Sequence, residues 1–239
     1  MRRRARVSPR TIIWHSALEF LLTFVLLFGV VTIVRWVIGP SAVARAVPHI
    51  HLQLLVVGTA VGLLITGLIL SPPGRASGGH MNPAISLAMW RFGVFPAAGV
   101  LPYTAAQLAG SVLGALAAGA VWGGAAARSP VSYAVLQAAA GWSAGQLFGT
   151  ETLSMFVIGL CLGVPRLAGV VPWIVGLFIG GAIALLGTAS GGSENPARQF
   201  GPAIASGQSR FLWASCLPPC SQPCWPAPRG GPSTRPARL

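Results

Sequence analysis

Five apolar runs, each near the length of a membrane-spanning helix, limit what this chain can fold into. An α-helix needs about 20 apolar residues to cross the hydrocarbon core of a bilayer. In lipid every backbone donor and acceptor has to be satisfied within the segment, so the runs are predicted to be helices and not strands. They cover residues 17–34, 52–70, 97–122, 143–164 and 167–189.

The charge composition also indicates a membrane protein. Only 8% of the 239 residues are charged, whereas a soluble domain carries about 25%. A formal net charge of +13 would suggest nucleic-acid binding in a soluble protein, but the basic residues here flank the apolar runs. We therefore expect the lipid bilayer as a partner, and no nucleic acid.

The basic residues predict an orientation as well. Residues 1–10 hold five Arg before the first run, and Arg75, Arg91 and Arg166 follow in loops on the same predicted side. Loops rich in Lys and Arg stay in the cytoplasm. We expect an integral membrane protein of a prokaryotic inner membrane, with residues 1–10 as a basic cytoplasmic N-terminus.

The two halves of the chain repeat each other. Residues 77–84 and 190–197 are identical at six of eight positions, and Glu19 and Glu151 occupy corresponding places in the first and fourth runs. An odd number of runs separates the copies, so they enter the membrane from opposite sides as an inverted repeat. The shared positions include two Asn-Pro-Ala turns, Asn82-Pro83-Ala84 and Asn195-Pro196-Ala197.

Each Asn-Pro-Ala turn is typical of a helix start. Asn is a favoured N-cap and Pro suits the first helical position. The stretches that follow, 85–90 and 198–205, are too short to span a bilayer, so we predict two half-helices. Their N-termini carry partial positive charge. If they meet at mid-membrane, the Asn amides could donate to a passing oxygen while the opposed dipoles repel cations.

Four polar side chains near these turns have predicted roles. Glu19 and Glu151 are expected to accept hydrogen bonds from the loop before each half-helix, with a proton-coupling role as the alternative. His80 is expected to orient its loop. Arg198 is expected to project into the pathway about one turn from Asn195 and to bond backbone carbonyls, because an unpaired buried Arg is costly.

These residues resemble the aquaporin and glycerol-facilitator family, the major intrinsic proteins, whose signature is two Asn-Pro-Ala boxes with an Arg after the second. Gln107 and residues 200–203 also resemble the family. The resemblance covers residues 11–213, with repeats at about 11–122 and 143–213. It implies an all-α membrane protein with an aquaporin-like inverted repeat, five recognisable spanning helices plus two re-entrant half-helices, and a homotetramer.

The resemblance also implies a selectivity filter. By position it would combine Val61 or Gly62 with Ile183, Gly192 and Arg198. None of these is aromatic or His, so we expect a wider and more apolar filter than that of strict water channels. The function implied is a passive channel for glycerol- or urea-sized neutral solutes, with water. Glu194, directly before the second turn, could pair with the half-helix dipole or with Arg198.

The end of the chain departs from the family. Residues 214–239 are rich in Pro, Cys and Arg and are predicted to be a disordered tail in place of a sixth span, with a reading-frame change as the interpretation. Cysteines in this tail have no accompanying His, so no metal site is expected, and neither a cofactor nor enzyme chemistry. The alternatives to a passive channel are a non-conducting truncated product and a coupled secondary transporter.

Overall fold

The computed structural model describes residues 7–137 and 139–208, and the regular structure in that part of the chain is all helical. Within it, four helices are long and apolar enough to cross a membrane: α1, α3, α6 and α8. The helices are α1 (Pro9–Val37), α2 (Ala42–Ala46), α3 (Ile50–Leu70), α4 (Pro72–Ser77), α5 (Pro83–Arg91), α6 (Ala97–Trp122), α7 (Gly124–Ala127), α8 (Ala144–Leu162), α9 (Val171–Leu186) and α10 (Pro196–Ser206).

The all-α fold with two short half-helices is confirmed, with differences at the helix ends. α1 begins earlier than predicted, because the Ser8 hydroxyl accepts a hydrogen bond from the Thr11 amide at 3.1 Å and Pro9 fills the first helical position. α9 is shorter than predicted, since Pro165–Val170 forms a 3₁₀ segment before it. The predicted tail, 214–239, lies outside the described residues.

Close backbone contact between α3 and α9 brings the two halves of the chain together. A Cβ added to Gly58 would lie 2.2 Å from the Gly180 carbonyl oxygen, and one added to Gly176 would lie 2.5 Å from the Gly62 carbonyl oxygen. Small residues four apart permit this approach in lipid, where helix association depends on close packing. Gly58 and Gly62 of α3 and Gly176 and Gly180 of α9 therefore form a small-residue contact between the two helices.

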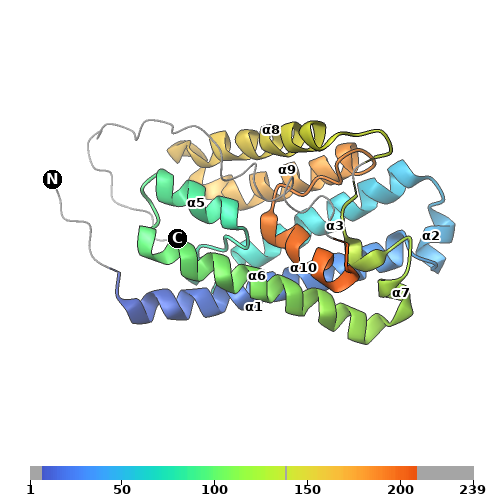
Figure 1. Ribbon diagram of the computed structural model, residues 1–239. Helices are drawn as coiled ribbons and strands as arrows, with labels where there is room; N and C mark the ends of the chain where they lie inside the picture. Colours follow the sequence, from blue (N-terminus) through green and yellow to red (C-terminus); the bar gives the residue numbers. More distant parts are fainter. Residues whose placement is uncertain (1–6, 138, 209–239) are drawn as a thin grey trace.

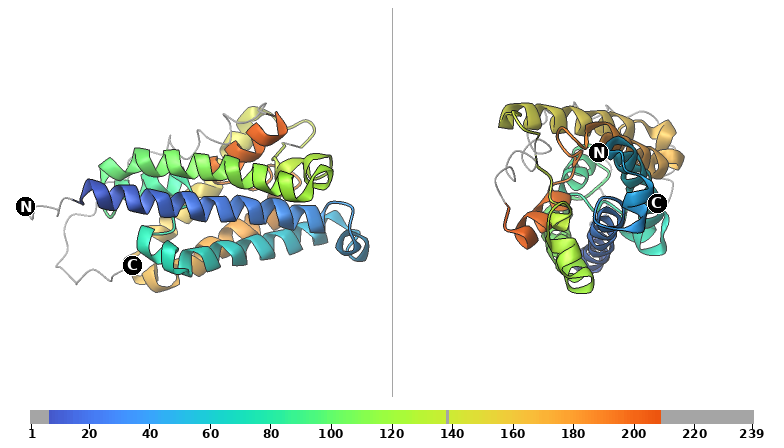
Figure 2. Two further views of the ribbon diagram at one scale, coloured as in Figure 1. Left: turned by 90° about the horizontal axis from the view of Figure 1, so that it is seen from below. Right: turned by 90° about the vertical axis from the view of Figure 1, so that its right-hand side faces the viewer.

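A second close contact joins α1 to α6, which run side by side in Figure 2. Cβ atoms added to Gly110 and Gly114 would each lie 2.4 Å from a carbonyl oxygen of α1, that of Phe20 and that of Phe24 respectively. These contacts fix the rotation of α1, and with it the direction in which its buried Glu19 points.

The half-helices α5 and α10 begin inside the bundle, within the length of the long helices (Figure 1). Asn82 caps α5: its Oδ1 accepts a hydrogen bond from the Ala84 amide at 2.8 Å. Asn195 caps α10 in the same way, accepting from the Ala197 amide at 2.9 Å. The chain therefore carries two helix N-termini to the interior, as the Asn-Pro-Ala turns predict.

Replacing Gly58 by Ala should destabilise the bundle. The new Cβ would meet the Gly180 carbonyl at 2.2 Å, and an overpacked contact of this kind costs about 1–3 kcal/mol. Gly67→Ala on the same helix is the matched control, because nothing lies within 4 Å of its added Cβ. Thermal unfolding of both variants in detergent should show a lower midpoint for Gly58→Ala alone; equal midpoints would contradict the α3–α9 contact.

Candidate functional site

Two crossing hydrogen bonds hold the half-helices together. Asn82 donates from Nδ2 to the Glu194 carbonyl at 2.9 Å, and Asn195 donates from Nδ2 to the Met81 carbonyl at 2.9 Å. Each Asn thus caps its own helix with Oδ1 and binds the opposite loop with Nδ2. A side-chain amide has two N–H donors, so these bonds leave one N–H of each Asn for another acceptor.

The two carbonyls that accept these bonds belong to residues with unusual backbone angles. Met81 has φ of 47° and Glu194 has φ of 42°, in the left-handed region that side chains other than glycine rarely adopt. Such a conformation costs about 1–3 kcal/mol and persists only where the surroundings hold it. The crossing bonds, together with the carboxylates behind each loop, supply that support.

Glu19 binds the first loop from α1. Its carboxylate accepts hydrogen bonds from the Ser77 hydroxyl at 2.7 Å, the His80 amide at 2.9 Å and the Met81 amide at 2.6 Å. The Gln107 side chain adds a fourth donor from α6 at 2.8 Å. Glu19 is fully buried, and four donors offset the cost of burying its charge.

Glu151 occupies the corresponding place in the second half. Its carboxylate accepts from the Ser193 amide at 3.0 Å and from the Glu194 amide at 2.7 Å. Both Glu residues are therefore bonded to the loop before their own half-helix.

His80 is held by its neighbours within the first loop. Its Nδ1 lies 3.0 Å from the Ser86 hydroxyl of α5, and its ring packs against Phe95 and Tyr103 with centroids at 4.9 and 5.4 Å. The Tyr103 hydroxyl in turn donates to the Ser77 carbonyl at 2.8 Å. This arrangement fits a residue that orients the loop.

Arg198 extends from the first turn of α10 and bonds a backbone carbonyl. Its Nη1 donates to the Ala134 carbonyl at 2.8 Å, in the 3₁₀ segment Ser132–Ala134 that connects the two halves. The next residue, Gln199, exchanges two hydrogen bonds of 3.1 Å with the Leu136 backbone. Sequence reasoning missed Ala134 and Leu136, because a carbonyl acceptor has no side-chain signature.

Ser111 is a second residue that sequence reasoning missed. Its hydroxyl donates to the Ala197 carbonyl and accepts from the Gly201 amide at 3.0 Å, so it joins α6 to α10. Ser111 lies four residues after Gln107 and therefore on the same helix face. That spacing of two polar residues in an apolar run was the available signal.

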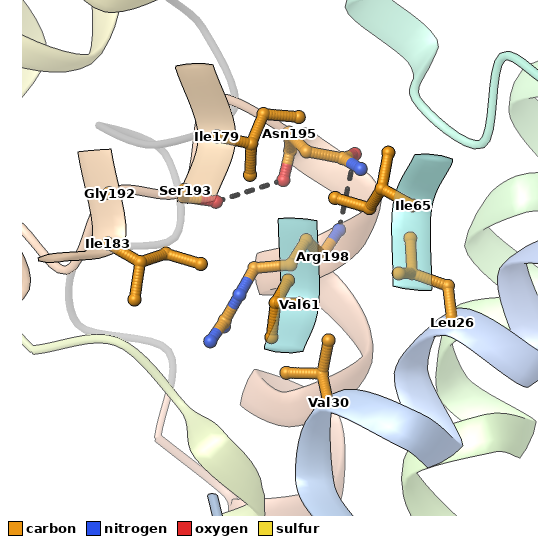
Figure 3. Close-up of a pocket in the computed structure, with 10 residues that line it drawn as sticks. All are labelled: Leu26, Val30, Val61, Ile65, Ile179, Ile183, Gly192, Ser193, Asn195 and Arg198. Atoms are coloured by element: carbon orange, nitrogen blue, oxygen red, sulfur yellow. Dashed lines mark hydrogen bonds between the residues drawn. The ribbon is translucent and has the colours of Figure 1, made fainter. Parts of the chain in front are cut away.

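A narrow cavity lies beside Asn195 and Arg198 (Figure 3). Its volume is about 20 Å³, enough for a water molecule. In the described part of the chain, neither an aromatic side chain nor a histidine lines it. The lining residues are Leu26, Val30, Val61, Ile65, Ile179, Ile183, Gly192, Ser193, Asn195 and Arg198.

The cavity distinguishes between the two second-span residues that the sequence left open. Val61 lines the cavity, whereas Gly62 packs against the Gly176 backbone of α9 and does not. Ile183, Gly192 and Arg198 line the same cavity as Val61. The structure therefore brings four of the five predicted filter residues together and places Gly62 in the helix contact instead.

Glu194 is not paired in the way the sequence suggested. Its side chain is 1% exposed, and within the described residues neither carboxylate oxygen has a hydrogen-bond partner. Arg198 donates to Ala134 instead, and the Glu194 side chain does not line the cavity. In the described part of the chain, Glu194 forms no hydrogen bond with Arg198 or with the first amides of α10, which Asn195 caps, but its charge still attracts that of Arg198.

The fold and this site define a helical membrane protein in which two re-entrant half-helices meet. The family model described as Major intrinsic protein matches residues 9–220. The chain therefore belongs to the major intrinsic protein family, and it is an integral membrane protein.

Individual relatives agree with this assignment. A probable aquaporin AqpM of Archaeoglobus fulgidus is 38% identical over 161 residues, which is 61% of each chain. A probable aquaporin TIP4-1 of Oryza sativa subsp. japonica is 33% identical over 84% of this chain and 79% of its own length. Aquaporin-8 of Mus musculus is 32% identical over 65% of this chain and 62% of its own. The chain thus spans about three fifths of the length of the Archaeoglobus fulgidus and Mus musculus relatives.

A solved structure shares the fold. The aquaglyceroporin from Plasmodium falciparum superposes with a TM-score of 0.70, covering 87% of this chain and 91% of that chain. Its sequence identity is 23%, so the likeness concerns the fold alone.

Replacing Glu19 by Gln should destabilise the first loop. The carboxamide keeps the shape but turns one acceptor into a donor, which would face donors such as the Met81 amide. Each buried donor left unsatisfied costs about 1–3 kcal/mol. Thermal unfolding should show a clear loss of stability. Ser16→Ala on the same helix is the control, because its hydroxyl bonds only the Ile12 carbonyl one turn back. A Glu19→Gln midpoint as high as that of the control would refute the support role.

Proposed function

We propose that this protein is a passive channel for water and small neutral solutes. One observation carries the proposal: the two Asn amides meet at the crossing of the half-helices, beside a narrow cavity that contains Arg198 and is otherwise mostly aliphatic. Donors at one side of an apolar passage bind a hydroxyl or carbonyl oxygen and leave its carbon atoms against the aliphatic wall. That pairing suits neutral polar molecules.

Ion exclusion follows from the same groups. The N-termini of α5 and α10 carry partial positive charge, and the Arg198 side chain adds a full one beside the cavity. A cation entering this region meets like charge and, among the described residues that line the cavity, finds no carboxylate. A neutral molecule does not meet this barrier.

The solute range is the finer part of the proposal. A static volume of about 20 Å³ admits water, and a glycerol- or urea-sized molecule needs the aliphatic side chains of the wall to change rotamer. The lining offers Val61, Ile183 and Gly192 around Arg198, and we assign the selectivity filter to these four residues. The relatives named aquaporin support the water part of this range.

The remaining roles belong to the same proposal. Residues 11–213 form the channel as two inverted repeats, and Asn82-Pro83-Ala84 and Asn195-Pro196-Ala197 form the pore turns. Glu19, Glu151 and His80 support the loops. The protein would assemble as a homotetramer in a prokaryotic inner membrane with its N-terminus in the cytoplasm. Because Glu19 and Glu151 both bind loop amides, their contacts favour a supporting role over proton coupling.

Narrowing the filter should separate water from larger solutes. In the double variant Val61→Phe and Ile183→His, we expect glycerol flux into liposomes to fall about tenfold, which corresponds to about 1.4 kcal/mol of added barrier. Water flux should fall less. Stopped-flow light scattering of reconstituted vesicles measures both.

Leu185→Phe is the control for this experiment. It adds an aromatic ring to α9 at a side chain that is 82% exposed and outside the cavity lining, so both fluxes should stay at the wild-type level. A wild-type protein that conducts water but excludes glycerol and urea would contradict the proposed solute range. A protein that conducts none of them would contradict the channel itself.

A further inference from the structure

The side chain of Glu194 is a buried carboxyl group with few bonding partners. It is 1% exposed, and in the described residues neither oxygen has a hydrogen-bond partner of ordinary distance and angle, although the Ser154 hydroxyl lies beside the carboxyl. By contrast, Glu19 accepts from donors such as the Ser77 hydroxyl and the His80 amide. An ionised carboxylate inside a membrane protein without donors or a cation is strongly unfavourable. A proton bound to one of its oxygens would remove the negative charge of the Glu194 side chain.

The first repeat shows that the fold does not require a polar side chain at the position of Glu194. Met81 and Glu194 occupy the same position in the two repeats, directly before the Asn-Pro-Ala turns. Leu22 and Ser154 also correspond, because each lies three residues after the Glu that binds the loop of its repeat. Met81 and Leu22 are 2% and 1% exposed and belong to the same apolar core cluster. The second repeat has replaced both apolar residues by polar ones, and Ser154 lies next to the Glu194 carboxyl.

The neighbouring charged groups do not neutralise Glu194. In the described part of the chain, the charges that act on it are Glu151 on α8 and Arg198 on α10. Glu151 is a second acidic side chain, and its oxygens already accept the Ser193 and Glu194 amides. Arg198 donates to the Ala134 carbonyl. Two acidic side chains whose charges repel each other in a medium of low dielectric constant favour the uptake of one proton.

We propose that Glu194 is a proton-binding site of the second re-entrant loop, with the Ser154 hydroxyl as the acceptor for the bound proton. The proton forms an O–H bond with one carboxyl oxygen and leaves that oxygen when the site empties, so no other reactant is required. A protonated carboxyl is neutral and donates one hydrogen bond.

The position of Glu194 links the proton to conduction. Its backbone amide donates to Glu151 at 2.7 Å, and its carbonyl accepts the Asn82 amide at 2.9 Å. Loss of the proton leaves an anion that attracts Arg198 and the donors around it. A movement of Glu194 disturbs the hydrogen bond between its carbonyl and the Asn82 side chain. A movement of Arg198 changes the shape of the cavity. The protonated form is therefore the conducting form, and flux falls as pH rises.

Infrared spectroscopy tests the site directly, because the whole chain contains only three acidic side chains. The full-length protein in dodecyl maltoside, a detergent without carbonyl groups, should show a protonated-carboxyl band at neutral pH. The band should be absent in Glu194→Gln. It should also be absent in the double variant Glu194→Met with Ser154→Leu, which restores the apolar pair of the first repeat. Absence of the band in the wild type, or its persistence in both variants, overturns the proposal.

Flux measurements test the consequence for conduction, and this part rests on the proposed channel function. Wild-type water flux in vesicles should fall at least about fivefold, the lower end of typical coupling between two sites, as Glu194 loses its proton in an alkaline titration. The infrared band should disappear over the same pH interval. Whatever their absolute flux, both Glu194 variants should lose its dependence on pH. A flux that stays constant while the band disappears overturns the link to conduction.

A matched control changes two histidines that lie away from the cavity. His49 and His51 lie exposed at the start of α3, and the variant His49→Asn with His51→Asn should keep the wild-type pH profile. The two readouts separate the hypotheses. If the wild type shows the Glu194 band but conducts nothing at any pH, the proposed channel function fails and the proton site stands. If it conducts but lacks the band, the proton site fails.

Discussion

The need to satisfy backbone polar groups inside a bilayer governs this structure. Two loops and two helix N-termini lie in the interior, where water is not available to their amides. The protein meets this need with side chains: Glu19 and Glu151 bind the loop amides, and Asn82 and Asn195 cap their helices while bonding the opposite loop. The donors that remain on the two Asn residues are the ones that a solute would use in the proposed channel, so the bonds that stabilise the fold also leave these donors free.

Helix packing sets the shape of the passage. The backbones of α3 and α9 approach so closely at Gly58 and Gly180 that neither position tolerates a Cβ without movement. This contact fixes the rotation of both helices and turns Val61 and Ile183 toward the cavity. An aliphatic wall beside Arg198 is therefore a consequence of glycines that do not touch the cavity themselves.

The two repeats share a framework but differ in polarity. In the first repeat, Glu19 has four donors and the residue before the Asn-Pro-Ala turn is the apolar Met81. In the second, Arg198 and the unpaired Glu194 lie on either side of Asn195 in the sequence. Burying more charge requires more partners, and here one partner is the carbonyl of Ala134, in the segment that connects the repeats. The functional asymmetry is thus concentrated in the second half.

The sequence by itself determined the helical class, the inverted repeat and the two interior helix starts. Apolar length, repeated motifs and Asn-Pro capping are local properties of the chain, and α5 and α10 begin where those patterns predict. Only the tertiary structure decided that Val61 and not Gly62 lines the cavity, and that Arg198 donates to the Ala134 carbonyl and not to the Glu194 carboxyl. One residue along a helix turns a side chain by about 100°, and backbone carbonyls carry no residue-specific signal. Such contacts depend on how segments distant in the sequence pack.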